Sequence, residues 1–155
     1  MVTKAPRDPG DASPPRLFTI KEAQNLIPEI EPLVAEMKSL FARIRTEVAD
    51  AASATGIPAG SPRLASHLET RGVAPALIGR VNELVRMVHE RGCVVNGPEA
   101  GLVDFPALLG SEIVFLCWKH GENLIEHWHR IPDGYAGRKP LLDLEGAEGG
   151  LTGVH

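Results

Sequence analysis

Apolar residues in the first half of the chain repeat with the period of an α-helix. After Thr19 they recur every three or four positions, at Leu26, Ile30, Leu33, Met37, Leu40 and Ile44. This spacing predicts one apolar face on a helix of about 30 residues. Thr19 and Glu22 have the spacing of a capping box, so we expect the helix to begin there. Because proline lacks a backbone donor and crowds the preceding turn, Pro28 and Pro32 predict a kink or restart near Ile27.

A second helical segment follows a stretch of small residues. Residues 51–62 are rich in Ala, Gly and Pro and predict a loop between two antiparallel helices. The helical pattern then covers residues 62–91, with an interruption at Gly72 and Pro75 and a stop at Gly92. The second apolar face is formed by Leu77, Val81, Leu84 and Val88. The two segments can bury these faces against each other as a long helical hairpin.

Beyond Gly92 the apolar period falls to about 2, which is typical of β-strands. Short β-prone runs cover residues 93–95, 101–105, 111–118 and 123–130. A hairpin-like break separates the last two runs. The chain is therefore predicted to have an α+β fold, in which a long antiparallel helical hairpin, kinked at Pro28 and Pro32, precedes a small antiparallel β-meander.

Length and composition set the domain organisation. A chain of 155 residues fits one domain. Residues 1–16 and 143–155 are rich in Pro, Gly and small polar residues, and we expect flexible tails there. A single domain should cover residues 17–142. Its helices would lie within residues 19–92, its sheet within 93–131 and a terminal loop within 132–142.

Charge, hydropathy and cysteine content limit the partners and the cellular compartment that we expect for this protein. The formal net charge is -4, and no cluster of Lys and Arg with interleaved aromatic residues is present, so we expect no nucleic-acid partner. No apolar stretch reaches the roughly 20 residues that span a bilayer, so we expect no membrane association. Cys93 and Cys117 form no C-x-x-C pair and indicate a reducing compartment, the cytoplasm.

Polar residues that can bind a metal gather on the last predicted strands. A tight turn between residues 119 and 122 would place Glu112 opposite His129, with His127 on the same face. A comparable hairpin after Pro106 would add Asp104. Carboxylates and imidazoles suit divalent zinc, manganese, iron or nickel, so one hypothesis is a metal site at Asp104, Glu112, His129 and His127. The alternative is a Glu112–His129 hydrogen bond that only fixes the sheet.

Two other interpretations of these residues stay open. If residues 122–129 were helical, Glu126 and His129 would form a Glu-x-x-His pair like those of di-iron bundles, although the chain does not complete the second set that such sites need. Alternation places Cys117 on the face opposite Glu112, which favours packing over nucleophilic chemistry. Trp118 and Trp128 are expected to be core residues of the small sheet.

The last polar candidate is Arg138, in a turn-rich loop that covers residues 132–140. Its guanidinium could anchor an anionic group of a ligand. The structural alternative is an ion pair with Asp104 or Glu112.

Several short motifs follow one another along residues 17–142. They are Phe18-Thr19, Glu22-Ala23, Leu26-Ile27-Pro28, Gly101-Leu102-Val103-Asp104-Phe105-Pro106-Ala107, Leu116-Cys117-Trp118, Gly121-Glu122, Trp128-His129, and Gly134-Tyr135-Ala136-Gly137-Arg138 with Pro140. Together they resemble an uncharacterised bacterial family, domain of unknown function 2203. The resemblance implies a helical hairpin with a small sheet and no established activity.

The resemblance also implies which positions of this chain would form a functional site. The matching positions are Asp104, Glu112, Cys117, Glu122, His129 and Arg138. His127 is outside the pattern, which favours Asp104, Glu112 and His129 with water completing the metal shell. Tyr135 stands where the family would have Phe, so its ring is expected to pack.

Three functions are therefore compared. The first is a divalent-metal protein, with hydrolysis as the candidate reaction, in which Glu122 and Arg138 orient a small polar ligand or the metal ligands. The second is a non-enzymatic interaction module that forms a homodimer through its helical hairpin, its C-terminal polar residues being structural. The third is a metal-free enzyme that uses Glu112 and His129 as acid and base.

Overall fold

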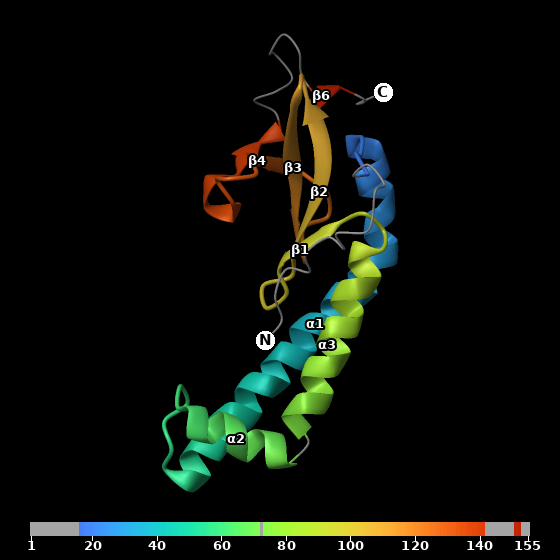
Figure 1. The fold of residues 1–155 in the computed structure, drawn as a ribbon. Coiled ribbons are helices and arrows are strands. Elements are labelled where there is room, and N and C mark those ends of the chain that lie inside the picture. Colours follow the sequence, from blue (N-terminus) through green and yellow to red (C-terminus); the bar gives the residue numbers. More distant parts are fainter. Residues whose placement is uncertain (1–15, 72, 142–150, 153–155) are drawn as a thin grey trace, which may run out of the picture.

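The fold was determined as a computed structural model, which describes residues 16–71, 73–141 and 151–152. The helices are α1 (Ile20–Thr55), α2 (Pro62–Arg71), α3 (Val73–His89) and the 3-10 turn η1 (Tyr135–Gly137). The strands are β1 (Val94–Gly97), β2 (Leu102–Leu109), β3 (Glu112–Lys119), β4 (His127–Arg130), β5 (Lys139–Pro140) and β6 (Leu151–Thr152). The sheet lies beside the first part of α1, while the pair α1 and α3 extends away from it to α2 at the far end (Figure 1). The predicted α+β architecture is confirmed.

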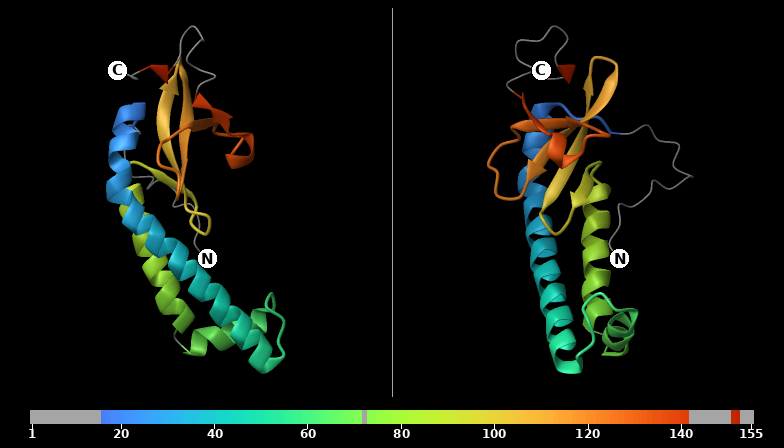
Figure 2. Two further views of the ribbon diagram at one scale, coloured as in Figure 1. Left: turned by 180° about the vertical axis from the view of Figure 1, so that it is seen from behind. Right: turned by 90° about the vertical axis from the view of Figure 1, so that its left-hand side faces the viewer.

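Helix α1 begins at the predicted capping box. Thr19 Oγ1 accepts the Glu22 N–H at 3.0 Å, and Glu22 Oε1 accepts the Thr19 N–H at 3.1 Å. The expected restart near Ile27 is wrong, because the helix is unbroken across Pro28 and Pro32. Both prolines are exposed, so water can satisfy the carbonyls that their missing donors leave free. The first part of α1 is inclined to the rest, as Figure 2 shows.

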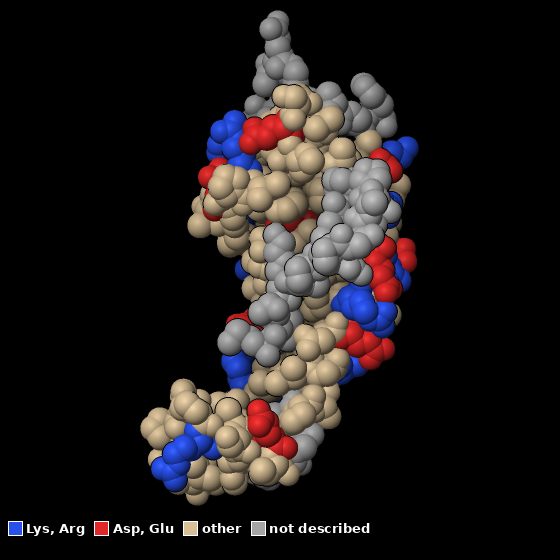
Figure 3. Space-filling model, in the orientation of Figure 1, with Lys and Arg blue, Asp and Glu red and all other residues tan. Residues whose placement is uncertain are grey.

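Helices α1 and α3 run antiparallel and bury the two predicted apolar faces. Helix α1 continues to Thr55 and ends at Gly56, whose φ is 73°, so the loop that was predicted for residues 51–62 is shorter. Oppositely charged side chains are interspersed along the helices in Figure 3. Arg80 and Glu36 form an ion pair between α3 and α1 at 2.8 Å. Within the described residues, no helix is long and apolar enough to cross a membrane.

The antiparallel sheet has the strand order β1-β2-β3-β4-β5, and β6 also pairs with β2. Strand β2 continues through Pro106 to Leu109, so the break expected at Pro106 is wrong and the turn lies at Gly110, where φ is 61°. The Pro106 carbonyl accepts the Phe18 N–H at 2.7 Å, which ties the start of α1 to the sheet. The core-facing sheet residues are Val95, Val103, Phe105, Ala107, Val114, Leu116, Trp118 and Trp128.

The predicted hairpin between the last two strands is also wrong. Residues 120–126 form a longer connection, and β4 covers only residues 127–130. Phe115 therefore pairs with His129, and Cys117 pairs with His127. Relative to the tight turn, this register is displaced by three residues, and an odd displacement moves every side chain of β4 to the other face. Trp128 therefore lies in the core with Leu116, its partner on β3, whereas His129 lies on the face away from the helices.

Candidate metal centre

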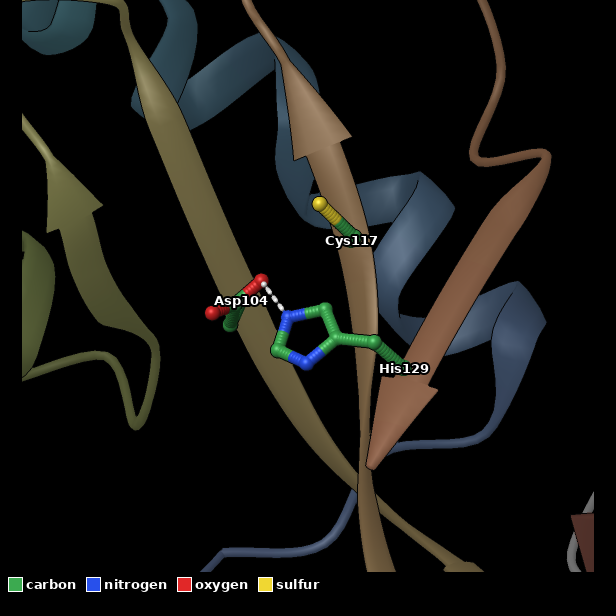
Figure 4. A group of neighbouring side chains, drawn as sticks. All are labelled: Asp104, Cys117 and His129. Carbon is green, nitrogen blue, oxygen red and sulfur yellow. Dashed lines mark hydrogen bonds and ion pairs between the residues drawn. The ribbon is translucent and has the colours of Figure 1, made fainter. Parts of the chain in front are cut away.

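Three potential metal ligands lie together on the sheet face away from the helices. Asp104 is on β2, Cys117 on β3 and His129 on β4. Asp104 is directly opposite Cys117 across the β2–β3 pair. One ligand atom from each side chain lies within 4.8 Å of the others (Figure 4). The relative exposures are 0%, 1% and 1%, respectively, so all three side chains are removed from solvent.

The hydrogen bonds of His129 determine which nitrogen of its ring carries a proton. Nδ1 lies 2.8 Å from the Arg130 carbonyl oxygen, and Nε2 lies 3.1 Å from Asp104 Oδ1. A carbonyl only accepts, so Nδ1 must carry a proton. In the neutral ring Nε2 then presents a lone pair to a carboxylate oxygen, and a cation is needed between them. The hydrogen bond to Asp104 raises the pKa of His129, and burial opposes this shift, so the pair favours a proton at Nε2 in the metal-free protein.

The second oxygen of Asp104 has a different partner. Asn96 Nδ2 donates to Asp104 Oδ2 at 2.7 Å. Asn96 stands in β1 at an irregularity of the ladder, since Val95 pairs with Val103 but Gly97 pairs with Leu102. Both carboxylate oxygens are thus engaged, one by His129 and one by Asn96.

Cys117 lies in a site that holds it as a thiol. Burial raises its pKa to about 12, and the neighbouring Asp104 carboxylate acts in the same direction. Arg138 Nη1, 3.9 Å from Cys117 Sγ, opposes this shift. The thiolate is therefore scarce at neutral pH without a metal, which disfavours nucleophilic chemistry. Strand alternation favoured packing for Cys117, whereas the family motifs placed it among the site positions; in the structure it borders Asp104 and His129.

Arg138 is fixed by Glu122 and not by the predicted partners Asp104 or Glu112. Its Nη1 and Nη2 donate to the two carboxylate oxygens of Glu122 at 3.2 and 2.9 Å. Glu122 Oε1 also accepts the Lys119 N–H at 2.7 Å. Burial would raise the pKa of Glu122, but the Arg138 hydrogen bond and the Lys119 N–H lower it. The Tyr135 ring packs on the Arg138 guanidinium, 4.7 Å from its carbon to the ring centroid.

The structure does not bring the other predicted ligands to this group. Glu112 is opposite Leu109, not His129, and forms a half-exposed ion pair with Arg130 at 3.5 Å. His127 lies beside Cys117, but its Nδ1 is 3.7 Å from Glu122 Oε2 and has no hydrogen-bond partner among the described residues. Of the four predicted metal ligands, only Asp104 and His129 meet.

The helical alternative for residues 122–129 is wrong as well, because His129 is a strand residue. The Glu-x-x-His pair that it required, Glu126 with His129, is therefore not formed on a helix. Trp118 and Trp128 are core residues, as expected, with exposures of 1% and 5%.

Gln24 explains why the connection before β4 is long. Its side-chain Nε2 donates to the Asn123 carbonyl at 3.1 Å, and its Oε1 accepts the Ile125 N–H at 2.8 Å. The amide of α1 thereby pairs with the connection as a neighbouring strand would. Neither Gln24 nor Asn96 was recognised from the sequence, because both contacts depend on the fold and follow no local motif.

Comparison with known proteins identifies a family but no characterised relative. No curated protein and no solved structure matches the chain. The model of the family described as "Uncharacterized conserved protein (DUF2203)" matches residues 16–141, which include every residue of the candidate metal centre. The chain therefore belongs to the DUF2203 family, as the sequence motifs had indicated.

Proposed function

We propose that this protein binds a divalent transition-metal ion through Asp104 Oδ1, Cys117 Sγ and His129 Nε2. The observation that carries the proposal is the approach of His129 Nε2 to Asp104 Oδ1, 3.1 Å, while Nδ1 is committed to a carbonyl. Metal-bound histidines commonly donate their other N–H to such an acceptor, which fixes the tautomer and the ring orientation. The fold thus presents a lone pair of His129 to the place where a cation would sit.

The donor set favours zinc or iron over manganese. Zinc binds nitrogen and oxygen at about 2.0 Å and thiolate at about 2.3 Å, so tetrahedral donors lie roughly 3.3–3.7 Å apart. The spacing of 3.1 Å between His129 Nε2 and Asp104 Oδ1 is close to this value, and small rotations of side chains whose donors lie within 4.8 Å complete the set. A thiolate ligand selects softer ions than the oxygen-rich sites that manganese prefers.

Three protein ligands leave a coordination position for water. Catalytic zinc sites with three protein ligands and a bound water lower the pKa of that water to about 7, so hydrolysis is the reaction class that we propose. Arg138, anchored by Glu122, lies beside Cys117 Sγ and would stabilise the thiolate form that a metal requires. Two buried, unpaired thiols agree with a reducing compartment, and we propose the cytoplasm.

No observation favours the interaction module as a second function. It requires an exposed apolar surface on the helical hairpin. The exposed large apolar residues among the described part of the chain are Leu17, Ile113, Leu124, Ile131 and Tyr135. All of them lie outside α1, α2 and α3, so a homodimer through the helices stays a prediction. The acid–base pair of Glu112 and His129 is not proposed again, because the two side chains do not meet.

The metal proposal is tested by elemental analysis of tag-free protein that has been stripped with chelator, incubated with zinc, iron(II), nickel or manganese, and desalted. Wild-type protein should retain zinc or iron in stoichiometric amount. Asp104→Asn, Cys117→Ser and His129→Gln should each lose it, whereas the matched control Glu112→Gln should not. Circular dichroism verifies that each variant is folded. Absence of metal in wild-type protein, or equal retention in the three variants, would overturn the proposal.

A further inference from the structure

Asn96 occupies a position where the β1–β2 ladder is irregular. The pairs Val94–Asp104 and Val95–Val103 are in regular register, but the next pair joins Gly97 to Leu102. Asn96 is therefore the extra residue of β1. Such bulges redirect a side chain and are frequent beside active sites.

The redirected side chain reaches a group that is otherwise enclosed. Asn96 is exposed, whereas its acceptor Asp104 is fully buried. The amide N–H contacts Oδ2 at 2.7 Å, and the other oxygen, Oδ1, faces His129. The two oxygens of one carboxylate are thus distinguished: a neutral donor occupies one, and the second points to the candidate ligands.

We infer that Asn96 is a positioning residue of the metal centre, which makes Asp104 a ligand through Oδ1 alone. The inference rests on the proposed function. A carboxylate is able to bind an ion through one or both oxygens, and a second Asp104 oxygen would add a fifth donor beside the position left to water. The Asn96 hydrogen bond opposes this, because chelation would require Oδ2 to leave its donor. The Asn96 amide is neutral, so it holds Oδ2 without neutralising the carboxylate charge, as a Lys or Arg side chain would.

This arrangement bears on what the centre can bind. With Asp104 held to one oxygen, a tetrahedral ion keeps one position for water or for an oxygen atom of a substrate. With Asp104 chelating, the site becomes five-coordinate and the second oxygen crowds that position. Asn96 therefore maintains the open coordination position on which a hydrolytic role depends.

Cobalt(II) substitution tests the inference, because its ligand-field bands are intense in four-coordinate sites and weaker in five-coordinate ones. The proteins are wild type, Asn96→Ala, Asn96→Gln, which keeps an amide donor, and the control Asn82→Ala, an exposed residue of α3. We expect Asn96→Ala to show weaker ligand-field bands and about 10-fold lower affinity or more, within the usual range for a lost outer partner. Asn96→Gln should recover part of both, and Asn82→Ala should match wild type.

The sulfur-to-cobalt charge-transfer band shows whether Cys117 still binds in each variant, so a distorted site is separated from a changed Asp104 mode. If wild type and Asn96→Ala bind cobalt with the same spectrum and affinity, the inference fails while the metal proposal stands. If wild type binds no cobalt and no other metal, both fail. A spectrum of Asn96→Ala without the sulfur band would show loss of the whole site and would likewise overturn the specific role of Asn96.

Discussion

His129 Nε2 lies 3.1 Å from Asp104 Oδ1, although β3 separates their strands. Cys117, the β3 residue opposite Asp104, has a small side chain, which leaves space for the imidazole over the intervening strand. The three residues therefore form a unit across the centre of the sheet.

Removal of one partner from this buried pair should be strongly destabilising. In chelator, at a pH below the ordinary histidine value of 6.5, Asp104→Asn leaves the His129 imidazolium buried without its counter-ion. A broken buried pair typically costs about 3–5 kcal/mol, and we expect a loss in this range in urea denaturation. In the double variant Asp104→Asn with His129→Gln, the free energy of unfolding should fall by much less than the sum of the decreases in the two single variants. Additive losses would show that the two side chains do not interact.

The pH dependence of stability should change sign when metal is added. In metal-free protein the pKa of His129 is raised, so the stabilisation by its pair with Asp104 is complete below 6.5 and is lost as pH rises through the folded-state pKa. A bound ion instead replaces the Nε2 proton and the Cys117 thiol proton, so stabilisation by zinc should increase with pH. Urea denaturation across a pH series, with chelator or with zinc, measures both trends, and His129→Gln should remove both. A zinc effect that does not depend on pH would contradict these ligands.

The Glu112–Arg130 ion pair should contribute little. Its side chains are 49% and 50% exposed, and exposed pairs are typically worth about 0–1 kcal/mol. Glu112→Gln should therefore lower the free energy of unfolding by less than about 1 kcal/mol, with unchanged metal retention. A large loss of metal in this variant would instead support the register in which Glu112 faces His129.

Gln24 should stabilise the connection between β3 and β4, which contains Glu122. Gln24→Ala removes two hydrogen bonds, each worth about 1 kcal/mol, and should destabilise the protein by roughly 1–2 kcal/mol. Amide hydrogen exchange at Ile125 should become faster, because its acceptor is lost. Gln24→Glu keeps that acceptor and should protect Ile125 better than Gln24→Ala. Equal exchange rates in wild type and Gln24→Ala would contradict this role.

The sequence was sufficient for the architecture because its signals are local. The helical period, the Thr19–Glu22 capping box and the change of period after Gly92 each depend on residues close together in the chain. Asp104 and His129 were also selected correctly as residues that come together. The family motifs extended these predictions over most of the chain.

The register could not be predicted in the same way. Residues 119–122 have the composition of a tight turn, but the connection extends to residue 126 and is held by Gln24, about 100 positions earlier. This contact forms only once α1 lies against the sheet. The three-residue displacement separated Glu112 from His129 and brought Cys117 into the group. Side-chain alternation therefore gave the faces of individual strands but not their alignment.

The depth of the three donor atoms has a kinetic consequence. Each belongs to a different strand, and each side chain is at most 1% exposed. An ion held by them would exchange with solvent only when the sheet opens locally, so the lifetime of the complex would be set by strand separation and not by ligand exchange in water. Such an ion would enter and leave slowly, and it would act as a cross-link between β2, β3 and β4.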